Sequence, residues 1–120
     1  MGLGNPAVPA AGTVLCALDD LADPGSRGFH WRVGEFLFAA FVVRRGSQAF
    51  GYVDRCPHAG LPLAIVEHRY LTRDGRAILC QAHAALFDPS TGGCLGGPAG
   101  TRALTAWAVA VGADGLVRAA

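Results

Sequence analysis

The sequence predicts an all-β domain, and three observations support that fold class. Apolar residues come in short runs, turn-forming glycines and prolines separate these runs at 17 and 7 positions, and no stretch keeps a helical period for more than a turn or two. Short strands broken by turns are typical of sheets that pack on one another. A chain of 120 residues has the length of one domain with its own hydrophobic core.

The first strands are expected soon after the N-terminus. Residues 14–18 form a short strand, because Asp19 and Asp20 end its apolar run and Asp23-Pro24-Gly25 is a strong turn signal. Residues 29–33 form a second short strand. Cys16 lies within the first strand, where we expect a small buried apolar residue and neither a ligand nor a reactive thiol.

The middle of the chain predicts a hairpin. Residues 35–44 pair with residues 48–53 around Arg45-Gly46-Ser47, and the second arm leads into Cys56. The first arm is apolar on both faces, so we expect packing to cover both; an open face would be a candidate docking patch. Two late strands complete the fold: one carries the alternating residues Thr105, Trp107, Val109 and Val111, and the other covers residues 116–118 after a turn at 112–115.

Two short segments carry the residues with chemistry. Each offers a thiol before an imidazole: Cys56-Pro57-His58 and Cys80-Gln81-Ala82-His83. Four soft or borderline ligands, delivered two by two, suit a metal centre better than an acid–base or nucleophilic site. Cys56 and His58 are too close in sequence to share a helix face, so both segments are expected to be tight loops at strand tips.

These segments resemble those of the Rieske iron–sulfur proteins. The likeness includes Phe87-Asp88-Pro89 and Gly97-Pro98-Ala99 and extends over residues 14–117. It implies an all-β, Rieske-type antiparallel β-sandwich with a small cluster-binding tip subdomain at about residues 54–100. The chain would then divide into a loose N-terminal lead, residues 1–12, and a Rieske domain, residues 13–120.

The resemblance also implies a cofactor and its ligands. A 2Fe–2S cluster would have Cys56 and Cys80 on its inner iron and His58 and His83 on its outer iron. Residues 96–99 would form the proline loop that covers the cluster. Zinc also accepts two cysteines and two histidines, so a zinc-stabilised interaction domain remains an alternative.

Two departures from the family refine the expectation. Leu61 and Ala82 stand where high-potential members carry a disulfide, which favours the lower-potential soluble Rieske ferredoxins. Residues 59–79 are a few residues longer than usual, and Asp74-Gly75 predicts a longer hairpin at residues 68–76. Within that hairpin, Arg69, Arg73 and Arg76 form a small basic group.

The resemblance implies an electron carrier that does not catalyse chemistry alone. Its redox partner proteins would be a reductase upstream and an oxygenase or other oxidoreductase downstream. A small Rieske subunit held permanently in a larger reductase, as in relatives of the nitrite reductase small subunit, is the alternative. A formal net charge of +1 gives no reason to expect nucleic acid or an anionic membrane as a partner.

The remaining residues are expected to have structural roles. Cys94 lies between the second ligand loop and the proline loop, and His30 and His68 have no cysteine at loop spacing. The longest apolar run, residues 36–43, is too short to cross a bilayer. Residues 1–12 lack the charged start and apolar centre of a signal peptide, so we expect a cytoplasmic protein.

Overall fold

The computed structural model confirms the all-β prediction. It describes residues 5–57, 62–64, 66–81, 84–97 and 102–120. In this part of the chain nine strands form three antiparallel sheets of three strands each, in the orders β1-β9-β8, β2-β3-β4 and β5-β6-β7. The elements are β1 (Val14–Ala17), the 3-10 helix η1 (Leu18–Asp20), β2 (Gly25–Val33), β3 (Phe36–Arg45), β4 (Gln48–Val53), β5 (Ile78–Cys80), β6 (Ala85–Phe87), β7 (Cys94–Gly96), β8 (Val109–Val111) and β9 (Leu116–Ala119).

The predicted central hairpin is confirmed as β3 and β4. Arg45 pairs with Gln48, so the turn between the strands contains two residues. The first of them, Gly46, has a φ of +62°, a backbone conformation that glycine adopts without strain. The Gly46 N–H also donates a 2.8 Å hydrogen bond to Asp23 Oδ1, which ties this turn to the segment before β2.

The strand before this hairpin is longer than predicted. β2 begins at Gly25, which pairs with Arg44, whereas residues 29–33 were expected. The added residues Gly25, Ser26, Arg27 and Gly28 are poor strand formers on their own, and β3 supplies the ladder that makes them extended. The first strand, β1, is one residue shorter than predicted: it stops at Ala17, and Leu18 is the first residue of the 3-10 helix η1.

One hydrophobic core lies between the two larger sheets. Its buried residues are Cys16, Leu18, Leu21, Val42 and Val117, from both sheets and the turn that joins them. Cys16 is therefore the small buried apolar residue that the sequence predicts, and burial raises the pKa of its thiol.

The late strand is shorter than predicted, because the residues before Val109 bond to β4 and do not form part of β8. The alternation from Thr105 to Val111 suggested one strand, but β8 contains only Val109–Val111. Trp107 instead lies along β4, where its N–H donates a 2.8 Å hydrogen bond to the carbonyl oxygen of Gly51. A side chain at position 51 would meet the Trp107 carbonyl oxygen, so Gly51 is what lets the two backbones approach.

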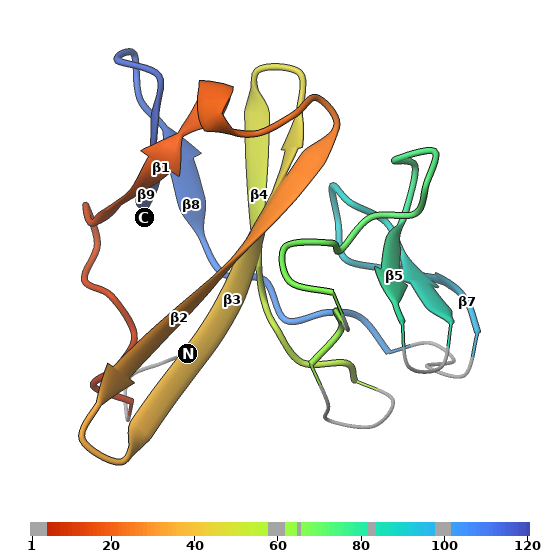
Figure 1. Ribbon diagram of the computed structural model, residues 1–120, viewed down its shortest axis with the longest axis horizontal. Helices are drawn as coiled ribbons and strands as arrows, with labels where there is room; N and C mark the ends of the chain where they lie inside the picture. Colours follow the sequence, from red (N-terminus) through yellow and green to blue (C-terminus); the bar gives the residue numbers. More distant parts are fainter. Residues whose placement is uncertain (1–4, 58–61, 65, 82–83, 98–101) are drawn as a thin grey trace.

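A second core connects the central sheet with the small third sheet. Phe41 and Tyr52 from β3 and β4 pack in one cluster with Ile78, Cys80 and Phe87. Figure 1 shows β5 and β7 to one side of the two larger sheets. The architecture thus has the small tip unit that the resemblance implies.

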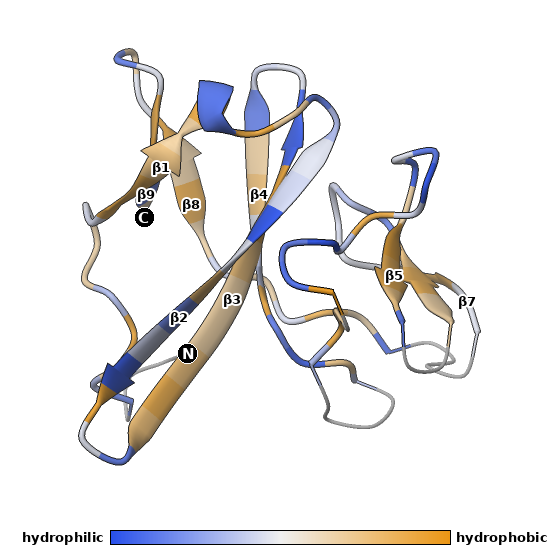
Figure 2. Cartoon of the chain, viewed as in Figure 1, coloured by the Kyte–Doolittle hydropathy of each residue, from blue (hydrophilic) through white to orange (hydrophobic). Residues whose placement is uncertain are grey.

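The apolar strand β3 is covered only in part. Residues Ala40, Phe41, Val42 and Val43 are fully buried, as predicted. At the start of β3, however, Phe36 and Leu37 are 50% and 67% exposed, so the prediction that both faces are covered is wrong there. Figure 2 shows β3 as hydrophobic at this end of the β2–β3 hairpin, beside the more hydrophilic end of β2. No helix in the described part of the chain has the length and apolar character that crossing a bilayer would need.

Residues 68–76, where a longer hairpin was predicted, pair across a tight turn with the residues that follow. Leu71 forms a single bridge with Ile78, and Thr72 N–H donates to the Ala77 carbonyl at 2.8 Å. Asp74 Oδ1 accepts hydrogen bonds from the Thr72 hydroxyl at 2.6 Å and the Arg76 N–H at 3.0 Å, and both lower the pKa of this carboxyl. Gly75, with a φ of +72°, completes the predicted Asp-Gly turn.

The N-terminal segment contacts the body of the protein at several points. Asn5 Nδ2 donates a 2.9 Å hydrogen bond to the Leu37 carbonyl, and Gly12 N–H donates to the Ala119 carbonyl at 2.7 Å. Ala7 is buried. The division of the chain into a lead and a domain at residue 12 stays a prediction.

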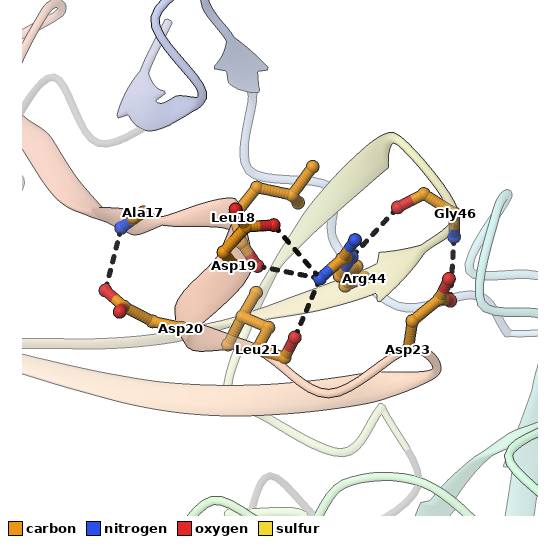
Figure 3. A network of polar contacts seen from close by, with 8 residues as sticks. All are labelled: Ala17, Leu18, Asp19, Asp20, Leu21, Asp23, Arg44 and Gly46. Atoms are coloured by element: carbon orange, nitrogen blue, oxygen red, sulfur yellow. Dashed lines mark hydrogen bonds and ion pairs between the residues drawn. The ribbon is translucent and has the colours of Figure 1, made fainter.

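One arginine fastens the 3-10 turn to the central sheet. Arg44 Nη1 donates to the carbonyl oxygens of Leu18 and Leu21 at 3.2 and 2.9 Å, and Nε donates to that of Gly46 at 2.9 Å (Figure 3). The Asp19 carboxylate lies 3.8 Å from the same guanidinium. Because the Arg44 side chain is only 19% exposed, these carbonyl groups have little access to water as a substitute donor.

Replacing Arg44 by leucine should therefore lower the free energy of unfolding by about 2 kcal/mol. Urea denaturation followed by circular dichroism would measure the change. Arg45→Leu is the matched control, because the neighbouring side chain is exposed and should cost less than about 0.5 kcal/mol. Equal losses in the two variants would contradict a specific role for Arg44.

Candidate metal centre

The two candidate cysteine ligands are buried in the same core. Cys56 follows β4 by three residues, and Cys80 is the last residue of β5. Both side chains are fully buried, neither cysteine is in a disulfide, and both belong to the cluster around Phe41 and Phe87. Buried cysteines at two strand ends fit a centre that needs thiolate ligands and is shielded from water on its inner side.

The described part of the chain contains only half of the proposed donor set. His58 and His83 lie outside the described residues, as do Leu61, Ala82 and the Pro98-Ala99 part of the proline loop. Within the described residues, no group of three or more His, Cys, Asp or Glu side chains comes together. The structure therefore describes the two candidate cysteine ligands and the backbone on either side of them.

Hydrogen bonds hold the two ligand loops together. Gln81, directly after Cys80, donates its N–H to the carbonyl oxygen of Leu63 at 2.8 Å. The Gln81 side chain then accepts from Val66 N–H and donates to the Arg69 carbonyl, both at 3.2 Å. The chain that follows the first loop is thus attached to the start of the second, which fixes the two loops relative to each other.

The chain that follows β7 contacts both ligand loops. Arg102 Nη1 donates a 2.9 Å hydrogen bond to the carbonyl oxygen of Pro57, between the two candidate ligands of the first loop. Gly97 has a φ of +94°, and a Cβ there would lie 2.8 Å from Ala85 Cα. Glycine is needed here because this backbone lies directly on the second loop.

The second loop itself has a strained turn. Ala84 N–H donates to the Cys80 carbonyl at 2.8 Å, which brings the residue before β6 close to the end of β5. Ala84 has a φ of +60°, a conformation that is uncommon for residues with a Cβ and is concentrated at functional sites.

A buried carboxylate lies beneath the first loop and has no counterpart among the sequence predictions. Asp54 Oδ1 accepts the Leu63 N–H at 2.9 Å, and Oδ2 accepts the Tyr70 hydroxyl at 2.8 Å. The Tyr70 ring stacks on Phe41 with ring centroids 4.1 Å apart. The signal available in the sequence was an aspartate directly after an apolar strand and two residues before Cys56.

The other candidate residues have structural contacts. The half-buried Cys94 thiol donates to the Gly96 carbonyl at 3.5 Å, and its side chain packs against the tip core. His68 Nδ1 accepts the Gly28 N–H at 3.0 Å, which attaches residues 68–76 to β2, whereas His30 is exposed on β2. Tyr52 donates its hydroxyl to the Pro89 carbonyl at 2.7 Å, and burial raises the pKa of Tyr52 to about 12.

A comparison with protein families decides between iron–sulfur and zinc. The sequence model of the Rieske [2Fe-2S] domain matches residues 13–110. The chain belongs to the Rieske [2Fe-2S] domain family. Its cofactor is a [2Fe-2S] cluster, and the buried thiols of Cys56 and Cys80, neither of which is in a disulfide, fit that group. The zinc alternative is set aside.

Solved structures support the Rieske fold. One chain in a complex of reduced oxygenase and oxidized ferredoxin in carbazole 1,9a-dioxygenase is 26% identical, with a TM-score of 0.67 over 88% of this chain and 90% of that one. The ferredoxin of carbazole 1,9a-dioxygenase from Nocardioides aromaticivorans IC177 is 22% identical, with a TM-score of 0.65 over 92% and 98% of the two chains. A putative nitrite reductase NADPH small subunit is 20% identical, with a TM-score of 0.60 over 90% and 97%. No curated protein matches the sequence.

Proposed function

We propose that this Rieske protein is a ferredoxin, a one-electron carrier that passes electrons from a reductase to an oxygenase or another oxidoreductase. The observation that carries the proposal is the pair of fully buried cysteines, Cys56 and Cys80, at two hydrogen-bonded loops of a Rieske domain. A [2Fe-2S] cluster bound there supplies reversible one-electron transfer.

The proposed ligands are Cys56 and Cys80 on the inner iron and His58 and His83 on the outer iron. The burial of both thiols supports the first assignment, since inner ligands must be shielded from water. The second rests on the Cys-Pro-His and Cys-x-x-His spacing of the sequence. In this arrangement the two imidazoles face the partner protein and shorten the distance that the electron crosses.

The proposed partners are a reductase upstream and an oxygenase or reductase downstream. A similar chain in a complex of oxygenase and ferredoxin supports the oxygenase. The second candidate function is a small Rieske subunit held permanently in a larger reductase. The exposed apolar side chains Val33, Phe36 and Leu37 favour this alternative, because a permanent partner would cover them.

Size-exclusion chromatography after native purification separates the two functions. A mobile ferredoxin elutes as a small protein, whereas a permanent subunit elutes with its partner.

We also propose a cytoplasmic location, where thiols stay reduced. None of the four cysteines, Cys16, Cys56, Cys80 and Cys94, is in a disulfide, which supports it.

The midpoint potential should lie at the low end of the Rieske range, at about −150 mV. Leu61 and Ala82 stand at the positions where high-potential members have a disulfide, so that contribution to a high potential is absent. Redox titration followed by EPR spectroscopy of the reduced protein measures it. A midpoint above about +100 mV would contradict the assignment to the ferredoxin branch.

A further inference from the structure

Asp54 is the one charged side chain that is buried within the described residues. It is 8% exposed and lies two residues before Cys56. Its N–H donates a 3.0 Å hydrogen bond to the Ala39 carbonyl, which fixes its backbone to β3. A buried carboxylate is costly unless hydrogen bonds compensate it, so its contacts need an explanation.

Both carboxylate oxygens are used, and each holds a different part of the tip. Oδ1 accepts the Leu63 N–H at 2.9 Å and so closes the base of the first ligand loop. The Leu63 carbonyl in turn accepts the Gln81 N–H at 2.8 Å, next to Cys80. One side chain thereby connects the segments that carry both proposed inner ligands.

The second oxygen has a donor that is itself held in place. Tyr70 donates its hydroxyl to Oδ2 at 2.8 Å, and its ring stacks on Phe41 at an interplanar angle of 6°. A Cβ on Gly28 would meet this hydroxyl, so the glycine in β2 makes room for it. Burial, the hydrogen bond to Asp54 and the charge of Asp54 all raise the pKa of Tyr70, which therefore remains a donor at neutral pH.

We propose that Asp54 is a positioning residue that joins the two ligand loops, and that its negative charge lowers the midpoint potential of the cluster. This inference rests on the proposed ligand set. Two residues of backbone span at most about 7 Å, so Asp54 lies close to Cys56. Reduction adds one negative charge to the cluster, and a nearby buried carboxylate opposes that addition because the surroundings screen it poorly.

Asp54→Asn tests the charge while keeping the shape. Asparagine Oδ1 can still accept the Leu63 N–H, and its amide can donate to the Tyr70 oxygen. At a fixed ambient potential the ratio of reduced to oxidised protein should rise about tenfold, which is a shift of about +59 mV for one electron. Iron content and the shape of the EPR signal should stay as in the wild type.

Two further variants make the result decisive. Tyr70→Phe keeps the carboxylate but removes its donor, so the same ratio should fall and not rise. Asp114→Asn removes an exposed carboxylate from the turn between β8 and β9 and should leave the ratio within twofold of the wild type. If Asp54→Asn does not retain iron, the fall in Tyr70→Phe alone supports the proposal.

The inference is overturned if Asp54→Asn retains iron and its potential does not rise. It is also overturned if Asp54→Asn does not retain iron and the ratio in Tyr70→Phe stays the same or rises. Failure of the proposed ligand set would look different, because the wild type itself would then lack the rhombic EPR signal of a reduced Rieske cluster.

Discussion

Cys56→Ser should abolish binding of the [2Fe-2S] cluster. The Cys56 side chain is fully buried in the tip core, and serine offers no thiolate for iron. Because cluster binding contributes to folding, the two ligand loops should also loosen. Iron and sulfide analysis measures the first effect, and amide hydrogen exchange across residues 54–63 and 78–87 measures the second.

Cys94→Ser is the matched control. Cys94 lies in β7, in the same sheet as Cys80, is half-buried, and donates its thiol to the Gly96 carbonyl, which a serine hydroxyl can also do. This variant should retain the iron and sulfide of the wild type. A cluster that survives Cys56→Ser, or one that is lost in Cys94→Ser, would contradict the assignment of the thiol ligands.

Gly51→Ala should lower the free energy of unfolding by about 3 kcal/mol. The new methyl group would meet the backbone carbonyl of Trp107 and lie 2.9 Å from Val109 Cγ1. Relief would require β4 to move away from the segment before β8, which breaks the hydrogen bond between Trp107 N–H and the Gly51 carbonyl. Urea denaturation with far-UV circular dichroism measures the loss.

Gly46→Asn provides the comparison within the same hairpin. Gly46 has open space around its Cα, and asparagine tolerates its φ of +62° better than other residues with a Cβ. Its effect should stay below about 1 kcal/mol. If the two substitutions cost the same, the close contact at Gly51 is not what holds the two larger sheets together.

Local patterns in the sequence were sufficient to predict the central hairpin of β3 and β4. The residues from Gln48 to Val53 form a strand as predicted, because a turn containing Gly46 lies between two runs of strand-forming residues. The same patterns did not predict the strand ends correctly where pairing with a distant part of the chain determines the structure. Gly25 is extended because Arg44 lies opposite it, and Trp107 leaves its strand because Gly51 accepts its N–H.

Some residues of the candidate site could be predicted from the sequence, whereas others could be identified only in the folded chain. Cys56 and Cys80 could be identified from their spacing to the histidines, and both are buried together. Asp54 and Tyr70 could not be paired from sequence, since 16 residues separate them and only the folded chain brings hydroxyl and carboxylate to 2.8 Å. The ligand roles of His58 and His83 stay predictions, because these residues lie outside the described part of the chain.

The proposed mixed ligation is tested most directly by pulsed EPR spectroscopy of the reduced protein. Two directly bound imidazoles should give two sets of strong 14N couplings on a rhombic signal of low average g. His83→Cys should remove one of these sets and lower the potential, because a thiolate adds negative charge to the cluster. A reduced wild-type signal without strong nitrogen couplings would contradict a Rieske cluster bound by Cys56, His58, Cys80 and His83.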